Sequence, residues 1–359
     1  MRKIRVLIID DSALMRQILT SLLSSDPEIE VIGIAQDPYI ARDKIKKLNP
    51  DVLTLDVEMP RMDGITFLEK LMAARPMPVV MVSSLTEAGC ETTLRALELG
   101  AVDFFTKPKF DMKEGMEAQA EILVSKIKTA VRARVVKKRA TGEISIAKIA
   151  PLVSSSMIKT TDTIIALGAS TGGPEALRQV LEVLPPNTPP VILTLHMPEK
   201  FTKSFADRLN KICQIRVKEA EDGDSVMTGH CLVAPGGYHM VLVRSGARYQ
   251  VRLNQEDKVQ WQRPSVDVMF NSVAKCAGRN AVGVIFTGMG KDGAEGLLEM
   301  KRAGAYTIAQ DEESCVVYGM PQEAVKTGAV DKILPLDKIP AAIIKKVESI
   351  NSVKSSEKL

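Results

Sequence analysis

The chain has 359 residues, of which 45% are apolar and 26% are charged, and its formal net charge at pH 7 is +4. These values are typical of a globular protein with two or three domains. No apolar run approaches the roughly 18 residues of a membrane span, and the run after Met1 stops at Asp10, too early for a signal peptide. The five cysteines have no C-x-x-C spacing, so we expect reduced thiols, a cytoplasmic location and no membrane insertion.

The first 110 residues contain four short apolar runs, predicted to be strands at 3–9, 51–55, 78–82 and 102–106. They lead into the polar residues Asp10, Asp11, Asp56, Ser83 and Lys107. Helix-length patterns separate the strands, which predicts a doubly wound parallel sheet with these side chains on its carboxyl edge.

Three carboxylates, Asp10, Asp11 and Asp56, are expected to converge at this edge. Two like charges about 4 Å apart repel by about 4 kcal/mol at an effective dielectric of about 20, so the cluster must protonate or bind a cation. Oxygen-only ligands favour Mg²⁺. The functional interpretation is that Asp56 accepts a phosphoryl group, Lys107 binds its oxygens and Ser83 hydrogen-bonds the product. As an alternative, each of the three aspartates could simply cap a separate helix. That interpretation does not explain why Lys107 is also placed at this edge.

This segment resembles the response regulator receiver family from residue 3 to about 120. The resemblance implies a flavodoxin-like, five-stranded parallel sheet, a Mg²⁺ site at Asp10, Asp11 and Asp56, and a cis bond before Pro108. It also places Ser83, Phe104 and Lys107 at the family's switch positions. Phe104 stands where a tyrosine is common and has no hydroxyl to move, so an ordinary core aromatic remains a serious alternative.

The connector is strongly basic. Residues 121–160 hold 9 Lys and Arg against 2 Asp and Glu, a net +7, whereas residues 1–112 hold 14 against 17, a net −3. No aromatics are interleaved with the basic residues and no DNA-binding motif is present, so a solvated linker is favoured over nucleic-acid binding. The expected organisation is a receiver domain at 1–120, a helical extension and basic flexible linker at 121–160, a catalytic domain at 161–349 and a polar tail at 350–359.

The second half opens with an apolar strand that runs from Thr163 into Gly168-Ala-Ser-Thr-Gly172, with a helix starting near Pro174. This order exposes Ser170 at a sharp turn above a parallel sheet, beside a helix N-terminus. The motif suggests acyl transfer. On the motif alone, a glycine-rich connection that holds a phosphate is an equal alternative.

Candidate partners for Ser170 follow two further predicted strands. His196 ends the strand at 190–195, and it alone among the three histidines ends a strand, whereas His239 is expected to be structural. Asp292 follows the strand at 281–287, at a turn into a helix. A neutral imidazole can take the serine proton, and a buried carboxylate can hold its tautomer. A histidine that ends a strand and an aspartate that caps a helix would each explain one of these residues. A single triad explains better why all three residues are expected at the same edge of the sheet.

The remaining pattern predicts helices near 175–184, 201–212, 266–277, 295–303 and 337–349. Between Asp224 and Asn254 it changes to strands broken by Gly and Pro, which predicts antiparallel hairpins inserted in a mostly parallel sheet. The fold class expected for this half is a mostly parallel, Rossmann-like α/β domain with an antiparallel hairpin insertion.

The motifs GASTGGP, LHMP and TGMGKDGA occur in the order Ser, His, Asp, which differs from the order in α/β-hydrolases. They resemble the catalytic domain of the chemotaxis protein-glutamate methylesterase family, CheB, over residues 163 to about 347. The resemblance implies that Ser170 is the nucleophile, His196 the base and Asp292 the orienting acid. It places Thr171 and the amide of Met289 beside the oxyanion, and it implies no cofactor for ester hydrolysis.

Together the two resemblances imply a monomeric serine hydrolase, gated by phosphorylation of Asp56 by the chemotaxis histidine kinase. Its substrates would be glutamate γ-methyl esters on the cytoplasmic helices of methyl-accepting chemotaxis receptors, and glutamine deamidation is allowed. Two alternatives stay open. One is the same triad and gate acting on another carboxylic ester or amide, and the other is a non-catalytic adaptor whose affinity Asp56 sets.

Overall fold

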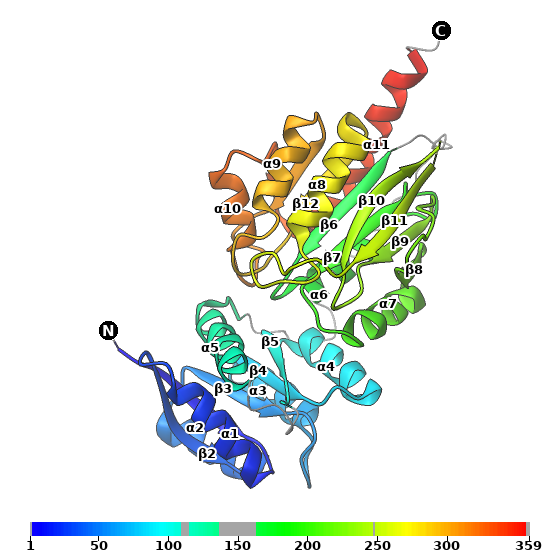
Figure 1. Cartoon of the computed structure of the whole chain (residues 1–359). Coiled ribbons are helices and arrows are strands. Elements are labelled where there is room, and N and C mark those ends of the chain that lie inside the picture. Colours follow the sequence, from blue (N-terminus) through cyan, green and yellow to red (C-terminus); the bar gives the residue numbers. More distant parts are fainter. Residues whose placement is uncertain (1, 109–114, 136–162, 247, 357–359) are drawn as a thin grey trace. The chain divides into compact units, whose positions relative to one another are not determined.

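The structure is a computed structural model that describes residues 2–108, 115–135, 163–246 and 248–356. It divides into two compact units, Met1–Ile144 and Ser145–Leu359, and each has its own central sheet (Figure 1). Residues 136–162, which include most of the basic linker predicted at 121–160, lie outside the described residues. Within the described part, no helix combines the length and apolar character needed to cross a bilayer.

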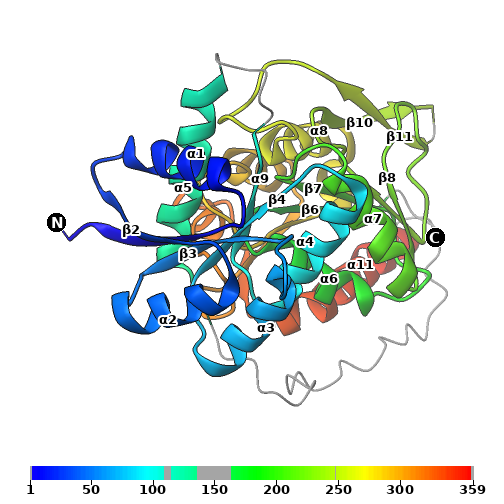
Figure 2. The same ribbon diagram turned by 90° about the horizontal axis from the view of Figure 1, so that it is seen from below.

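The first unit is a doubly wound, five-stranded parallel sheet, as predicted, with strand order β2-β1-β3-β4-β5. Helices α1 and α5 cover one face, and α2, α3 and α4 the other (Figure 2). The strands are β1 (Ile4–Ile9), β2 (Ile29–Ala35), β3 (Val52–Asp56), β4 (Val79–Ser83) and β5 (Asp103–Thr106). The helices are α1 (Ala13–Ser24), α2 (Pro38–Leu48), α3 (Gly64–Ala74), α4 (Glu87–Leu99) and α5 (Met116–Arg132).

Strand register decides which side chains meet at the carboxyl edge of this sheet. Ile9 of β1 pairs with Leu55 of β3, so Asp10 and Asp56 occupy equivalent positions on neighbouring strands. Strands β3 and β4 are buried throughout, because helices cover both faces of a parallel sheet. The sheet therefore carries its acidic residues to a common edge.

Helix α5 belongs to this unit. It packs against α1 and is tied to the segment after α1 by an ion pair between Lys128 and Asp26 at 2.8 Å. The boundary that the sequence suggested at residue 120 falls inside this helix.

The second unit is built on a seven-stranded parallel sheet with strand order β14-β13-β12-β6-β7-β9-β8. Its strands are β6 (Ile164–Ala169), β7 (Val191–Leu195), β8 (Arg216–Glu219), β9 (His230–Val233), β12 (Ala281–Ile285), β13 (Tyr306–Gln310) and β14 (Lys332–Leu334). Its α-helices are α6 (Gly173–Glu182), α7 (Phe201–Ile212), α8 (Val266–Ala277), α9 (Ala294–Arg302), α10 (Met320–Lys326) and α11 (Ile339–Ser356), and two short 3₁₀ helices are η2 (Gly278–Asn280) and η3 (Leu336–Lys338). The predicted polar tail from residue 350 begins inside α11.

The predicted hairpin insertion is present as β10 (His239–Ser245) paired antiparallel with β11 (Arg248–Asn254), in a sheet of its own. The prediction was wrong for β9, which lies in the same segment but joins the parallel sheet between β7 and β8. Cys231 and Val233 of β9 are fully buried, so its side chains gain more from the main core than from a surface hairpin.

Helix α8 packs against the hairpin strand β10 and against β6 and β12 of the main sheet, on the same face as α9 and α10 (Figure 1). Its close approach to β6 depends on Gly168, because a β-carbon there would lie 2.3 Å from Cγ1 of Val266. The absence of a side chain at Gly168 therefore lets the N-terminus of α8 reach the strand that carries Ser170.

Candidate active site and acceptor site

Three adjacent strands supply the predicted triad. In the sheet order β12-β6-β7, Ser170 follows β6, His196 follows β7, and Asp292 lies in the loop after β12. Ala169 pairs with Leu195, and the amide of His196 donates to the carbonyl of Ala169 at 3.2 Å. Ser170 and His196 are therefore neighbours at the carboxyl ends of adjacent strands, where open α/β sheets place their sites.

His196 and Asp292 are in direct contact, with Nε2 of the ring 2.7 Å from Oδ2 of the carboxylate, and both side chains are buried. Since an ionised carboxylate only accepts hydrogen bonds, Nε2 carries the proton and Nδ1 is the basic nitrogen. Among the described residues, no hydrogen bond joins the Ser170 hydroxyl to this ring. Such contacts are often long before substrate binds.

The carboxylate of Asp292 lies at the N-terminus of α8. It accepts hydrogen bonds from Oγ of Ser265 at 2.7 Å and from the amides of Val266 at 2.7 Å and Asp267 at 3.1 Å. Burial raises the pKa of Asp292, but the hydrogen bonds from His196, Ser265 and Val266 outweigh burial and hold this pKa below its usual value. Asp292 is thus a stable anion, favoured further by the helix dipole.

The turn that presents Ser170 is held by its main chain. The Ser170 amide donates to Thr287 O at 3.1 Å, and the Gly173 amide donates to Ser170 O at 2.7 Å. Gly172 has φ 77°, a left-handed conformation that glycine adopts freely, and a β-carbon there would also meet Val316. The hydroxyl oxygen of Ser170 is not needed for any of these backbone bonds.

The two residues expected beside the oxyanion differ in exposure. Thr171 is buried and its carbonyl accepts from Oγ1 of Thr287 at 3.0 Å, whereas Met289 is half exposed. Gly288 packs directly on the turn that presents Ser170, since a β-carbon on it would lie 2.8 Å from Cβ of Ser170. The loop that carries Met289 therefore passes next to Ser170.

The contacts of Ser265 and Asp267 with Asp292 were not predicted from the sequence. The carboxylate of Asp267 accepts from the Gly296 amide in the first turn of α9 at 2.7 Å, while Asp292, just before α9, binds the first turn of α8. Burial, with the nearby charge of Asp292, raises the pKa of Asp267 to about 6. A serine before a helix is an N-cap signal, but only the tertiary fold shows that this cap also binds Asp292.

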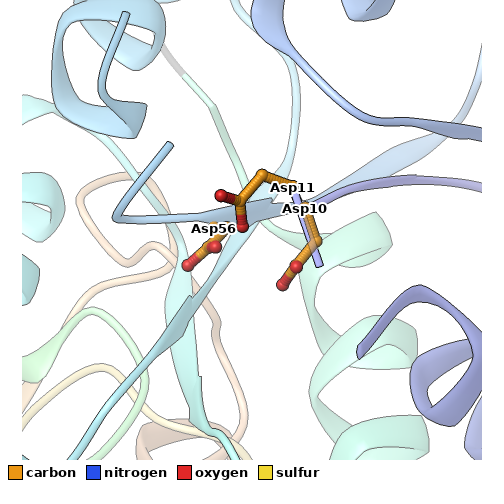
Figure 3. Close-up of side chains that lie close together, drawn as sticks. All are labelled: Asp10, Asp11 and Asp56. Atoms are coloured by element: carbon orange, nitrogen blue, oxygen red, sulfur yellow. The ribbon is translucent and has the colours of Figure 1, made fainter. Parts of the chain in front are cut away.

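The receiver unit gathers a second cluster. Asp10, Asp11 and Asp56 each offer a carboxylate oxygen within 4.8 Å of the others, at the carboxyl edge of the sheet (Figure 3). Nζ of Lys107 lies 2.8 Å from Oδ1 of Asp56 and 3.4 Å from Oδ2 of Asp10. The structure therefore brings together the acids and the lysine that the sequence placed at one edge.

Burial raises the pKa of Asp56 to about 6, and the charge of Asp10 adds to this effect against the opposing influence of Lys107. Burial also raises the pKa of Asp10. Oδ2 of Asp56 is buried and has no hydrogen-bond partner among the described residues. An all-oxygen donor set with an unpartnered buried oxygen fits a hard divalent cation such as Mg²⁺.

The two other predicted switch residues are both buried. Oγ of Ser83 accepts from Oγ1 of Thr93 at 2.7 Å and lies 3.2 Å from Gly89 O, so it is bonded to α4 in this state. The ring of Phe104 lies 5.5 Å from Nζ of Lys126. The expectation of a cis bond at Lys107–Pro108 was wrong: the cis peptide bond in the described part of the chain is Arg263–Pro264.

In metal-free buffer, Asp56→Asn is expected to stabilise the receiver unit at pH 7.5 and to have little effect near pH 4. The folded-state pKa, about 6, exceeds the ordinary value of 3.8, so folding favours the protonated acid. That contribution is complete below the ordinary value and is lost as pH rises through about 6. At pH 7.5 the free energy of unfolding of the wild type is therefore lower by on the order of 1–3 kcal/mol than at low pH, whereas the neutral side chain of Asp56→Asn avoids this loss.

Amide hydrogen exchange of β3 in the full chain, measured across this pH range, reports the change in stability. The control is Asp43→Asn, since the Asp43 side chain is 70% exposed. Equal pH dependence in the wild type and Asp56→Asn would contradict the prediction.

Comparison with known proteins agrees with this two-part architecture. The sequence profile described as "CheB methylesterase" matches residues 165–343, and the one described as "Response regulator receiver domain" matches residues 6–120. A protein-glutamate methylesterase/protein-glutamine glutaminase of Pectobacterium atrosepticum is 59% identical over 97% of this chain and 98% of its own length. A protein of the same name from Salmonella typhimurium is 57% identical over 99% of this chain and its full length (100%). The crystal structure of the Thermotoga maritima CheB methylesterase catalytic domain is 40% identical, with a TM-score of 0.51, covering 52% of this chain and 98% of that one.

Proposed function

We propose that Ser170, His196 and Asp292 are the catalytic triad of this protein. The premise is that the chain belongs to the CheB family of protein-glutamate methylesterases with an N-terminal receiver domain. The enzyme hydrolyses glutamate γ-methyl esters and deamidates glutamines. The observation that carries the residue assignment is the buried His196–Asp292 hydrogen bond of 2.7 Å, on the rim where Ser170 follows the strand next to that of His196.

Catalysis begins when Oγ of Ser170 attacks the side-chain carbonyl carbon of the substrate and its proton passes to Nδ1 of His196. Nδ1 takes this role because Nε2 donates to Asp292. The imidazolium returns the proton to the leaving oxygen, and methanol departs from the acyl-enzyme. Water, deprotonated by His196, then attacks the acyl carbon. The bond from that carbon to Oγ of Ser170 breaks, the imidazolium returns the proton to Oγ, and glutamate is released. With a glutamine substrate the leaving group is ammonia and the product is the same.

The negative oxygen of each tetrahedral intermediate is assigned to the side of Ser170 where Thr171 and the amide of Met289 lie. The contact between Gly288 and the Ser170 turn supports this assignment. Removal of one hydrogen-bond donor at such a position typically lowers turnover by about 10²–10³-fold. The contribution of Met289 comes from its backbone, since its side chain is partly exposed.

The receiver domain supplies the regulation. We assign Asp56 as the phosphoryl acceptor, with a histidine kinase of the chemotaxis system as donor. Asp10, Asp11 and Asp56 would hold Mg²⁺, which offsets the negative charge of the phosphoryl group. Lys107, already bound to Asp56, would bind a phosphoryl oxygen. Ser83 would leave its bonds to α4 to hydrogen-bond the product, while Phe104 fills the switch position without a hydroxyl.

The protein is further proposed to act as a monomer in the cytoplasm, on the cytoplasmic helices of chemoreceptors. All five cysteines are free thiols in the structure, as expected in a reducing compartment.

The test of gated esterase activity is methanol release from methylated receptor membranes. We expect a small phosphodonor with Mg²⁺ to raise the rate of the wild type about tenfold or more, since about 1.4 kcal/mol between two states gives a tenfold change in population. Asp56→Asn should remove the increase, whereas Asp43→Asn, on the exposed face of α2, should keep it. Activation that survives in Asp56→Asn would reject the acceptor assignment, and no release by the wild type would reject the substrate.

A further inference from the structure

Among the residues that the structure describes, every donor that binds Asp292, other than His196, comes from the start of one helix. Ser265 Oγ and the Asp267 amide bind Oδ1, and the Val266 amide binds Oδ2. The Ser265 hydroxyl also accepts from the Val268 amide as the N-cap of α8, at 3.4 Å. The orientation of the triad acid is therefore set by where the first turn of α8 lies.

A second histidine holds this turn. The amide of Ser265 donates to Nδ1 of His239 at 3.2 Å, and the other ring nitrogen, Nε2, lies 3.0 Å from the carbonyl oxygen of Asp257. An amide N–H can only donate and a carbonyl can only accept. The ring must therefore be neutral, with its proton on Nε2. His239 is fully buried, so water does not replace these partners.

The bonds form a continuous chain from the hairpin to the triad. It runs from Asp257 through His239 to Ser265, and from Ser265 through Asp292 to His196. His239 is the first residue of β10, and Asp257 lies in the loop that leaves β11. The antiparallel hairpin is thereby connected to the reacting histidine through three side chains.

We propose that His239, in its neutral Nε2–H form, is a positioning residue for the esterase reaction: it fixes the first turn of α8 so that Ser265 and its neighbours hold Asp292 in the orientation that His196 requires. The proposal deepens the proposed function and rests on the triad assigned there. It differs from a purely structural role because it predicts a loss in turnover that stability does not explain.

The structure offers a matched control in the same pair of elements. Oγ of Ser272 accepts from the Leu242 amide at 2.8 Å, so it also ties α8 to β10, but farther along the helix and without a link to Asp292. Loss of this bond should weaken the packing of α8 on the hairpin as loss of the His239 bond does. Ser272→Ala therefore separates packing from positioning.

The test measures kcat and KM for methanol release by the full chain in the presence of phosphodonor, with unfolding followed in parallel. We expect His239→Leu to lower kcat about 10–100-fold with little change in KM, the size expected for a small misplacement of a catalytic group. His239→Asn, whose side-chain oxygen can accept from the Ser265 amide, should recover most of the loss. Ser272→Ala should lose stability but keep kcat within about twofold.

A second measurement does not depend on any variant folding. Long-range ¹H–¹⁵N spectra of the histidine-labelled wild type, which has three histidines, report the tautomer of each ring. A neutral Nε2–H tautomer for His239 supports the proposal, and an imidazolium or an Nδ1–H tautomer near pH 7 overturns it. Normal kcat in folded His239→Leu, or an equal fall in Ser272→Ala, overturns it too. A wild type without esterase activity, or Ser170→Ala with full activity, would instead refute the proposed function.

Discussion

Ser170→Ala is expected to lower methanol release by about 10⁶-fold, to the level left by substrate binding and the oxyanion site alone. The reason is that no acyl-enzyme can form without Oγ, and the His196–Asp292 pair has no nucleophile to activate. The backbone bonds of Ser170, from its amide to Thr287 and from the Gly173 amide to its carbonyl, do not involve the side chain. The variant should therefore fold as the wild type does.

The measurement compares single-turnover methanol release by the two proteins on methylated receptor membranes, and thermal unfolding checks the fold. An active-site titration with a reactive ester should label the wild type once per chain and leave Ser170→Ala unlabelled. Methanol release within tenfold of the wild type would show that another group is the nucleophile. An unchanged effect on receptor output with no methanol release by either protein would favour the adaptor alternative.

Asp292→Asn is expected to lower kcat by about 10⁴-fold. Asp292 receives four hydrogen bonds, two on each carboxylate oxygen, whereas asparagine offers one acceptor oxygen and an amide that donates. If the new amide faces His196, the ring must accept at Nε2 and carry its proton on Nδ1. Nδ1 then cannot take the proton of Ser170. If the amide turns the other way, it meets the N–H of Asp267 instead.

Asp267→Asn is the matched control, since Asp267 is a buried acid in the turn of α8 whose amides bind Asp292. Its oxygens accept from the Gly296 amide and from Nε2 of Gln260, and the Gln260 amide can turn to present its oxygen to the new donor. The raised pKa of Asp267, about 6, also means that a neutral group is tolerated there. We expect kcat within about tenfold of the wild type. Activity of Asp292→Asn at the same level as this control, in folded protein, would remove Asp292 from the triad.

The strand ends were predictable because they depend on local patterns. Buried strands read as continuous apolar runs, and the residue after such a run lies at the carboxyl edge of a parallel sheet. Asp10, Asp56, Ser170 and His196 were placed by this rule, and their neighbours in the sheet agree with it. The strand β9 was misplaced because a short run beside Gly and Pro fits a hairpin or an interior strand equally well.

The sequence by itself determined the two-domain α/β architecture, the acidic cluster with its lysine, and the three residues proposed as the triad. The tertiary structure alone decided which nitrogen of His196 faces Asp292, that Asp292 lies at the N-terminus of α8 rather than capping α9, and that His239 holds Ser265. The physical reason is that these contacts join a side chain to another side chain or to a backbone amide 25 to 96 residues away in the chain. Such contacts depend on how close α8 comes to β6 and on side-chain rotamers. Neither of these can be predicted from a local pattern of apolar and polar residues.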